Sequence, residues 1–523
     1  MDRSVTTTQQ GARRPAPGRQ VLRRRAARVL GANWTGTSTV PSRDLYPHQW
    51  SWDSAFIAIG LRHLSPLHAQ VELETLLRAQ WGDGRVPHIV FNDAVPPGAY
   101  FPGPDFWRST EAGREAGAPA DVRTSGLVQP PVHALAAWLV HRADPGLSRA
   151  RSFLPRVRPR LAAWHGYLLR DRDAGGAGLA AVLHPWEQGM DNSPCWDGPL
   201  SRIEPAERDA CRRADLHHGV ARDRPTDLDY GRYVRLATEY RDRGYGGGGY
   251  GGGGYGGAGG YAGQLGTSFC VEDPAFNALL IISEYALALI EAEVDAEVDA
   301  DAESERHGDG ENAAPPPGPP PPKAPRASRT RRARADTLTR VLVDRLGDPA
   351  DELFHCRDLR SGRLIAERGV TGLIPLMLPA LPRDIAAALV RTAAGPRFGL
   401  DGAARLVPSH DLTSAAFDPY RYWRGPAWFN TNWLLEKGLR LHGEAARADR
   451  LRRTLLDVAG ASGFAEYVAP YTGRARGARG FGWTAALTLD LLCDPLARGP
   501  QDEESADGER GGLSEGSEGE VWA

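Results

Sequence analysis

The sequence predicts an all-α protein built as a toroid of helix pairs. About a dozen segments place apolar residues at helical spacing, whereas alternating strand patterns are short, as in residues 86–91. Long polar and aromatic connections separate these segments, and connections of this kind often carry function. In a toroid of helix pairs, the ends of the inner helices and these connections line one central pocket.

The individual helices follow from local signals along the chain. Residues 21–31 carry the first helix signal. Ser65 followed by Pro66 is a typical helix start, and the apolar residues after it share one face: Ala69, Leu73, Leu76 and Leu77. By the same reasoning, further helices are expected at residues 131–140, 153–169, 229–241, 274–290, 336–346, 384–392, 430–442, 446–458 and 483–492.

Low-complexity stretches interrupt and follow the helical body. Residues 245–261 repeat tyrosine and glycine, a composition that buries too little surface to fold alone. Residues 293–335 pass from an acidic run through polyproline to a basic run. We therefore expect one domain over residues 32–495 with flexible insertions at 245–261 and 293–335, a partly disordered N-terminal extension (1–31) and an acidic disordered tail (496–523).

The composition argues against several classes of protein. A net charge of -2 gives no global field for nucleic acid or a membrane surface. Five cysteines without CxxC spacing favour free thiols over a disulfide framework or a zinc site. The arginine-rich N-terminus lacks the apolar run of a signal peptide, and we expect no apolar stretch of the roughly 18 residues that a membrane span needs. These features predict a cytoplasmic protein with a small-molecule partner.

We expect neither a metal nor another cofactor. The candidate metal ligands are His184, His217, His218 and His410, and their spacing matches no familiar metal site. The glycine tract is repetitive and lacks the Lys and Ser ending of a phosphate-binding loop.

The most informative segment is WEQGMDNSPCWD, residues 186–197. It places three acids and two tryptophans within twelve residues, and indole faces stack on sugar rings while carboxylates bond sugar hydroxyls. Cleavage of a glycosidic bond needs two carboxyl groups. Asp191 lies near Trp186 in sequence, and a carboxyl group against an indole has a raised pKa that suits a general acid. Glu187 and Asp197 are alternatives, and a cluster of capping residues or ion pairs is the structural alternative.

A second carboxylate stands in a similar aromatic setting at Glu466. The segment GFAEY, residues 463–467, is short and begins with glycine. Glu466 in such a segment is positioned to hold a water molecule against an anomeric carbon. The structural alternative is a glutamate that bonds a backbone turn.

Other segments supply candidate pocket residues. In YPHQWSWD, residues 46–53, the aromatic rings and Asp53 suit a terminal hexose, or else begin a buried helix. Gln129 stands before a helix start and presents its amide to the pocket, or is a simple loop residue. The segment YWRGPAWFNTNW, residues 422–433, is expected to form a pocket wall. Arg224 and Tyr230 fit a carboxylate ligand, and a surface arginine is the alternative.

Taken together, these segments resemble glycoside hydrolase family 63, and in particular its bacterial mannosylglycerate and glucosylglycerate hydrolase branch. The blocks YPxQWxWD, WExGMDNSPxWD, YWRGPxWxNTNW and FxEYxxPxTG occur in the family's order across residues 32–495. The resemblance implies an (α/α)6 barrel that hydrolyses an α-glycosidic bond with inversion and without a cofactor. It also implies that Asp191 is the acid and Glu466 the base.

The resemblance further implies a substrate-binding set. Arg224 and Tyr230 are similar to residues that hold the glycerate carboxylate. The implied glycone-binding residues are Tyr46, Trp50, Asp53, Gln129, Trp186, Trp423, Trp428 and Trp483. Two positions depart from the family pattern: Gln188 replaces a usual serine, and Gly480 stands where a polar side chain, often glutamine, reaches the aglycone.

Our hypothesis is an inverting α-glycosidase acting on a small α-glucoside or α-mannoside, with glucosylglycerate or mannosylglycerate first. The carboxyl groups of Asp191 and Glu466 should then lie about 6.5–9.5 Å apart. One alternative is a trehalase- or glucoamylase-like α-glucosidase on neutral sugars. Another is a non-catalytic sugar-binding protein, and a weaker one is nucleic-acid association through the Tyr/Gly tract and the basic run at residues 326–334.

Overall fold

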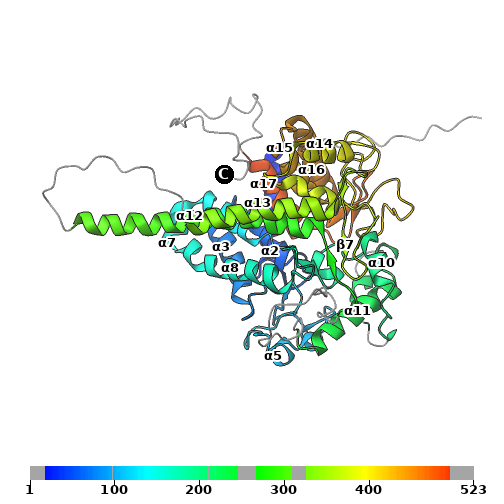
Figure 1. Cartoon of the computed structure of the whole chain (residues 1–523), viewed down its shortest axis with the longest axis horizontal. Helices are drawn as coiled ribbons and strands as arrows, with labels where there is room; N and C mark the ends of the chain where they lie inside the picture. Colours follow the sequence, from blue (N-terminus) through cyan, green and yellow to red (C-terminus); the bar gives the residue numbers. More distant parts are fainter. Residues whose placement is uncertain are drawn as a thin grey trace, which may run out of the picture.

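A computed structural model describes residues 18–96, 98–208, 211, 213–217, 220–245, 267–308 and 326–494. Helices dominate these residues, as the sequence predicts (Figure 1). The strands are two residues long and pair antiparallel in four small sheets. In sheet order they are β1 (Gln49–Trp50) and β2 (Ile89–Val90); β3 (Ala181–Val182), β4 (Val271–Glu272), β7 (Arg357–Asp358) and β8 (Arg363–Leu364); β5 (Gly347–Asp348) and β6 (Leu353–Phe354); and β11 (Ala475–Arg476), β10 (Tyr467–Val468) and β9 (Ala427–Trp428).

Six elements pack against one another in a closed sequence. Each contacts the next, and the last contacts the first, in the order α2 (Ser51–Leu61), α6 (His133–Ala143), α12 (Pro274–Gly308), η6 (Val370–Met377), α15 (Phe429–Leu441) and α17 (Gly482–Cys493).

A second set of helices packs against these six elements. These are α1 (Arg19–Asn33) on α17, α3 (Pro66–Arg78) on α2 and α6, α8 (Phe153–Asp171) on α6 and α12, α13 (Arg326–Leu346) on α12, α14 (Arg383–Ala394) on η6, and α16 (Ala445–Ser462) on α15 and α17. Figure 1 shows α12 and α13 side by side, with the far end of α12 projecting beyond its neighbours.

The connections carry the remaining helical segments. They are α4 (Pro104–Trp107), α5 (Ser109–Ala112), α7 (Pro145–Ala150), α9 (Pro185–Gln188), α10 (Asp197–Leu200), α11 (Asp227–Asp242), and the 3₁₀ helices η1 (Pro194–Trp196), η3 (Ala214–His217) and η4 (Ala221–Asp223).

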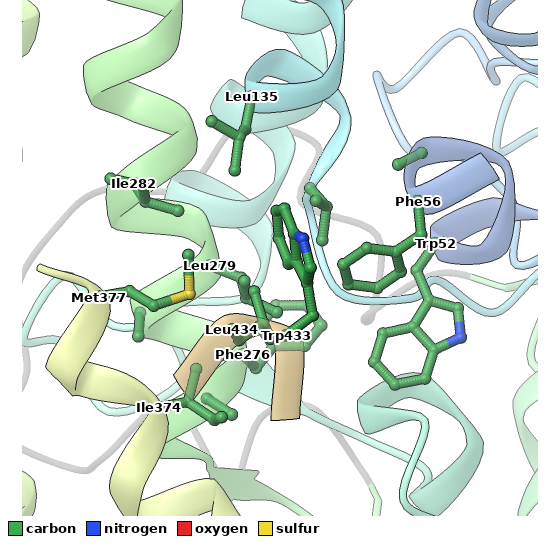
Figure 2. Packing of buried hydrophobic residues seen from close by; sticks show 14 of the residues in the cluster. Trp52, Phe56, Leu135, Phe276, Leu279, Ile282, Ile374, Met377, Trp433 and Leu434 are labelled. Atoms are coloured by element: carbon green, nitrogen blue, oxygen red, sulfur yellow. The ribbon is translucent and has the colours of Figure 1, made fainter. Parts of the chain in front are cut away.

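Large apolar side chains fill the space between the six inner elements. Figure 2 shows Trp433 of α15 among Phe56 of α2, Leu135 of α6, Phe276 of α12 and Met377 of η6. All five side chains are buried. Side chains from five elements that are distant in sequence therefore form one core. Burial of each such side chain contributes about 1.5–3 kcal/mol to stability.

Several predicted boundaries need correction. The helix predicted at 21–31 is α1, and its buried residues Leu22, Ala26 and Leu30 pack in the main core, so it belongs to the helical body rather than to an extension. The predicted flexible insertion at 293–335 is partly helical, because α12 continues to Gly308 and α13 begins at Arg326. Here Arg331 and Arg334 of α13 pair with Glu284 and Glu291 of α12, which gives the basic run a structural role.

The tyrosine–glycine tract and the tail fall mainly outside the described residues. Only the first residue of the predicted tract is described, and Tyr245 is fully buried against Trp81 and Trp107 rather than flexible. Residues 246–261 and the predicted tail at 496–523 lie outside the described part of the chain, as do residues 1–17.

One expectation about apolar stretches is wrong. By length and composition, Pro274–Asp299 within α12 is sufficient to cross a membrane. However, 83% of its apolar window is buried inside the fold. This helix packs against α6, α8, α13 and η6, so its apolar surface is explained by its central position in the core.

Candidate active site

A pocket of about 120 Å³ lies where the predicted motifs meet. Trp50, Trp52 and Asp53 reach it from the start of α2, and Trp483 reaches it from the first turn of α17. Eleven of the twelve predicted site residues line it: Tyr46, Trp50, Asp53, Gln129, Trp186, Asp191, Arg224, Tyr230, Trp423, Glu466 and Trp483.

Trp428 is the one predicted site residue that does not line the pocket. Its ring lies parallel to that of Trp423, with centroids 3.8 Å apart and an interplanar angle of 1°. Trp428 is 1% exposed and stacks on Tyr467 of β10, the strand that pairs with β9. The side chain therefore supports Trp423 from behind, and its predicted role as a direct pocket residue needs correction.

The loop that carries Asp191 is held at several points. Gly189 adopts a left-handed conformation with φ 81°, and a Cβ there would lie 2.6 Å from the Trp52 ring, so only glycine fits. The Met190 N–H donates to the side-chain oxygen of Gln188 at 2.9 Å. The indole N–H of Trp196 donates to the Met190 carbonyl at 2.8 Å. These contacts fix the backbone that leads into Asp191 at the edge of the pocket.

Asp191 has the electrostatic surroundings of an acid. Burial raises its pKa to about 7, and the negative charges of Glu466 and Asp215 act in the same direction. Arg224 and a backbone hydrogen bond oppose the shift. A carboxyl group with a pKa near neutrality can carry a proton to a leaving group under ordinary conditions.

The two alternative acids lie outside the pocket and are engaged elsewhere. Glu187 is fully buried and accepts hydrogen bonds from both terminal nitrogens of Arg172, at 2.6 and 2.8 Å. Asp197 has a half-exposed side chain and pairs with Arg424 at 2.9 and 2.6 Å. Each therefore has a structural partner, and Asp191 is the one acid of the segment that lines the pocket.

Glu466 differs from Asp191 in its surroundings, because its carboxylate accepts several hydrogen bonds. The hydroxyls of Tyr46 and Tyr422 donate to its Oε1 at 3.0 and 3.2 Å, and the Ala478 N–H donates to its Oε2 at 2.9 Å. The neighbouring Gly477 has φ 63°, and a Cβ there would lie 2.3 Å from Oε2. The carboxylate is 1% exposed, so these donors fix its orientation.

Arg224 lies beside Glu466 and has an unused donor. Its Nη1 donates to the Tyr46 hydroxyl at 3.2 Å, and its guanidinium lies 4.9 Å over the Tyr422 ring. Its Nη2 is 3.8 Å from Glu466 Oε2 and has no hydrogen-bond partner among the described residues, although the residue is only 6% exposed. The alternative of a surface arginine is therefore wrong. A buried donor without a partner costs free energy, so this one suits an anionic or polar ligand.

Two further unused donors border the same pocket. The indole N–H groups of Trp423 and Trp483 are buried and have no hydrogen-bond partner in the described part of the chain. Trp423 also has a positive φ of 32°, a strained conformation that is concentrated at functional sites. Sugar hydroxyls are acceptors of the kind that these indoles lack.

The sequence reasoning missed several pocket residues. Tyr422 stands in the quoted block at 422–433 but was not selected, although its hydroxyl contacts Glu466. Tyr100, His88, Phe481 and Asp215 also line the pocket. No local pattern identifies these four, because each reaches the site through a connection whose path depends on the whole fold.

Two of the histidines considered as metal ligands, His184 and His410, have other partners. His184 caps α9 through the Trp186 N–H and contacts the Tyr233 carbonyl. His410 lies 3.3 Å from a carboxylate oxygen of Glu367, and His218 is outside the described residues. A cluster of Asp348, Asp351 and His355 has a spacing that fits a metal ion, but it lies outside the pocket, and Arg368 and Arg397 already pair with Asp351.

Comparison with known proteins connects this pocket to a family. The profile of the mannosylglycerate hydrolase MGH1-like glycoside hydrolase domain matches residues 46–315 and 323–484. The chain is 36% identical to a mannosylglycerate hydrolase of Rubrobacter radiotolerans, covering 90% of this chain and 96% of that one. It is also 36% identical to a glucosylglycerate hydrolase of Mycolicibacterium hassiacum, covering 90% and 97% of the two chains.

A solved structure gives the same relationship. The crystal structure of the GH63 mannosylglycerate hydrolase of Thermus thermophilus, in complex with Tris and D-glycerate, superposes with a TM-score of 0.74. The two chains are 35% identical, and the match covers 90% of this chain and 99% of that one. This chain therefore belongs to the mannosylglycerate hydrolase MGH1-like family of glycoside hydrolases.

Proposed function

We propose that this chain hydrolyses the α-glycosidic bond of a small glycoside of glycerate and inverts the anomeric configuration. The observation that carries the proposal is the contrast between two carboxyl groups in one pocket. Asp191 has a raised pKa, whereas Glu466 accepts hydrogen bonds from two tyrosines and one backbone amide. A pair of carboxyl groups in such different surroundings suits one acid and one base.

In the proposed reaction, Asp191 donates its proton to the glycosidic oxygen. Glu466 removes a proton from a water molecule that attacks the anomeric carbon on the opposite face. The bond to the aglycone breaks, and the sugar leaves with inverted configuration. The mechanism requires a carboxyl separation of about 6.5–9.5 Å, which leaves room for the water.

We assign the sugar ring to the aromatic part of the pocket. The indole rings of Trp50, Trp186 and Trp423 offer surfaces for its C–H faces, and Asp53 and Gln129 offer polar groups for its hydroxyls. The unpartnered indole N–H of Trp483 adds a donor. These contacts orient the anomeric carbon between the acid and the base.

We assign the glycerate carboxylate to Arg224. Its unpartnered Nη2 is buried in the pocket, and a guanidinium bonds a carboxylate strongly. The similarity to hydrolases named for mannosylglycerate and glucosylglycerate supports this choice of aglycone. Tyr230 lines the same region, but its hydroxyl donates to the Phe101 carbonyl at 3.1 Å, so we assign it a packing role beside the aglycone.

Three further proposals concern the fold, the catalytic domain and the location of the protein. We propose that the inner and outer helices form an (α/α)6 barrel, which the closed sequence of contacts from α2 to α17 supports. We propose that residues 32–495 form one catalytic domain together with α1, in keeping with the family match over 46–315 and 323–484. We propose a cytoplasmic location, supported by the cysteines, which are free in the described part of the chain.

The test is sugar release from glucosylglycerate, mannosylglycerate, trehalose and maltose by the wild type and by Asp191→Ala, Glu466→Ala and Arg224→Ala. We expect hydrolysis of a glycerate glycoside, and loss of this activity in the first two variants. Proton NMR at early times should show the anomer opposite to that of the substrate. Release of the same anomer would contradict inversion.

Arg224→Ala separates the anionic substrate from neutral ones. It should raise KM for the glycerate glycoside by about 10-fold to 100-fold, because the loss of a charged hydrogen bond costs about 1.5–3 kcal/mol. Arg479→Ala, which removes an arginine outside the pocket lining, is the matched control. Efficient hydrolysis of trehalose or maltose alone would replace the proposed substrate with a neutral one.

A further inference from the structure

Asp215 is a pocket residue that the proposed chemistry does not use. It lies in η3 and lines the pocket together with Tyr100, Arg224 and Tyr230. Its side chain is 21% exposed, so it borders the opening rather than the core.

The carboxylate of Asp215 is held in a fixed orientation. Arg213 donates from Nε to Oδ1 and from Nη2 to Oδ2, both at 2.9 Å. Arg213 is itself bonded to Asp227 at 2.9 Å and to the Pro225 carbonyl at 3.0 Å, and its guanidinium lies 4.4 Å over the Tyr230 ring. Five contacts therefore position one carboxylate at the edge of the pocket.

Asp215 acts on the side of the pocket that holds the acid. Its negative charge is among the causes that raise the pKa of Asp191, Tyr100 and Tyr230. The acid protonates the oxygen that joins the sugar to the aglycone. Residues that lie around Asp191 on the side away from the sugar therefore face the aglycone. Asp215 and Arg224 therefore border the same chamber.

The carboxylate has unused capacity as an acceptor. Each carboxylate oxygen accepts about two hydrogen bonds, and Arg213 supplies one to each. Among the described residues, this side of the pocket thus offers an unpartnered donor, Arg224 Nη2, and an acceptor, Asp215, whose two oxygens each accept one hydrogen bond from Arg213. An aglycone with a carboxylate at one end and a hydroxyl at the other matches this pair.

On the basis of the proposed function, we propose that Asp215 is a specificity-determining residue that accepts a hydrogen bond from a hydroxyl group of the glycerate aglycone. It selects hydroxylated acids over acids of the same size that lack this hydroxyl. A site that bonds a substrate hydroxyl rejects the analogue without it, because its own polar group is then left without a partner.

The experiment compares kcat/KM for the glycerate glycoside with kcat/KM for the corresponding lactate glycoside, in which a methyl group replaces the terminal hydroxymethyl. The full-length wild type, Asp215→Ala and Asp215→Asn are measured. We expect the wild type to prefer glycerate by at least about 10-fold, and Asp215→Ala to reduce this preference to about 2-fold or less. Asp215→Asn keeps an acceptor oxygen and should retain an intermediate preference.

Asp227→Asn is the matched control, because it removes the negative charge of the outer partner of Arg213 and keeps the carboxylate of Asp215. Its glycerate-to-lactate ratio should equal that of the wild type. If Asp215 only anchors its loop, Asp215→Ala will lower kcat/KM for both substrates equally and leave the ratio unchanged, which would overturn the proposal. A wild-type ratio near 1 would also overturn it.

The wild type and Asp215→Ala together distinguish failure of the proposed function from failure of the Asp215 assignment alone. If it hydrolyses neither acidic glycoside, the proposed function fails, and the assignment of Asp215 fails with it. If it hydrolyses the glycerate glycoside but Asp215→Ala keeps the full preference, only the assignment of Asp215 fails.

Discussion

Replacement of Glu187 by glutamine tests which acid of the 186–197 segment is structural. Glu187 is fully buried and accepts from both terminal nitrogens of Arg172 and from the Leu183 N–H at 2.7 Å. Glutamine has nearly the same shape but no charge. The substitution therefore leaves the guanidinium of Arg172, which is 2% exposed, without its counter-charge.

The expected loss of stability is large. Removal of one partner from a buried ion pair costs about 3–5 kcal/mol. The hydroxyls of Tyr167 and Tyr240 still accept from Arg172, at 2.9 and 3.2 Å, so we expect about 3 kcal/mol. Asp197→Asn is the matched control, because Asp197 has a side chain that is 51% exposed and its pair with Arg424 contributes about 0–1 kcal/mol.

The assay is urea unfolding followed by tryptophan fluorescence, combined with activity in the absence of urea. Glu187→Gln should shift the unfolding midpoint to lower urea and keep activity within about 10-fold of the wild type, because the residue does not border the pocket. Asp191→Asn should have the opposite profile, with no activity and an intact fold. A stable but inactive Glu187→Gln protein would refute the assignment of Asp191 as the acid.

Three further predictions concern the pocket. Activity should fall as pH rises through about 7, because Asp191 must be protonated; a pH–rate profile flat to pH 9 would contradict this. Asp191 also stays protonated in the folded state at pH values above its unfolded pKa of 3.8, so the free energy of unfolding of the wild type should fall between about pH 4 and 7. At pH 8, Asp191→Asn should be more stable by about 2–4 kcal/mol in urea unfolding, and equal stability would count against the raised pKa. Tyr422→Phe removes one donor from Glu466 and should lower kcat about 5-fold to 10-fold, whereas Tyr471→Phe, an exposed position, should leave kcat unchanged.

The sequence predicted the outer helices well because each has one apolar face. In α16, for example, Ala448, Leu451, Leu455 and Val458 recur at helical spacing and are buried. Two inner elements were not among the predicted helices for the opposite reason, although a buried helix start was the alternative for residues 46–53. All eleven residues of α2 are buried, so no polar face marks it as a helix, and η6 contains Gly372 and Pro375, which favour a turn in a local reading.

The sequence by itself determined the chemistry of the candidate site. Clustering of carboxyl groups with indoles pointed to Glu466 and to Asp191, with Glu187 and Asp197 as alternatives, and the structure places Asp191 and Glu466 in one pocket. Local sequence carries this information because a sugar site needs these side-chain types together.

Only the tertiary structure decided which side chain of each cluster faces the pocket. Glu187 and Asp191 stand four positions apart, yet one binds Arg172 and the other borders the pocket. Trp423 lines the pocket while Trp428 stacks behind it. The physical reason is that direction and burial depend on contacts between segments distant in the chain, and these contacts also set the pKa of Asp191.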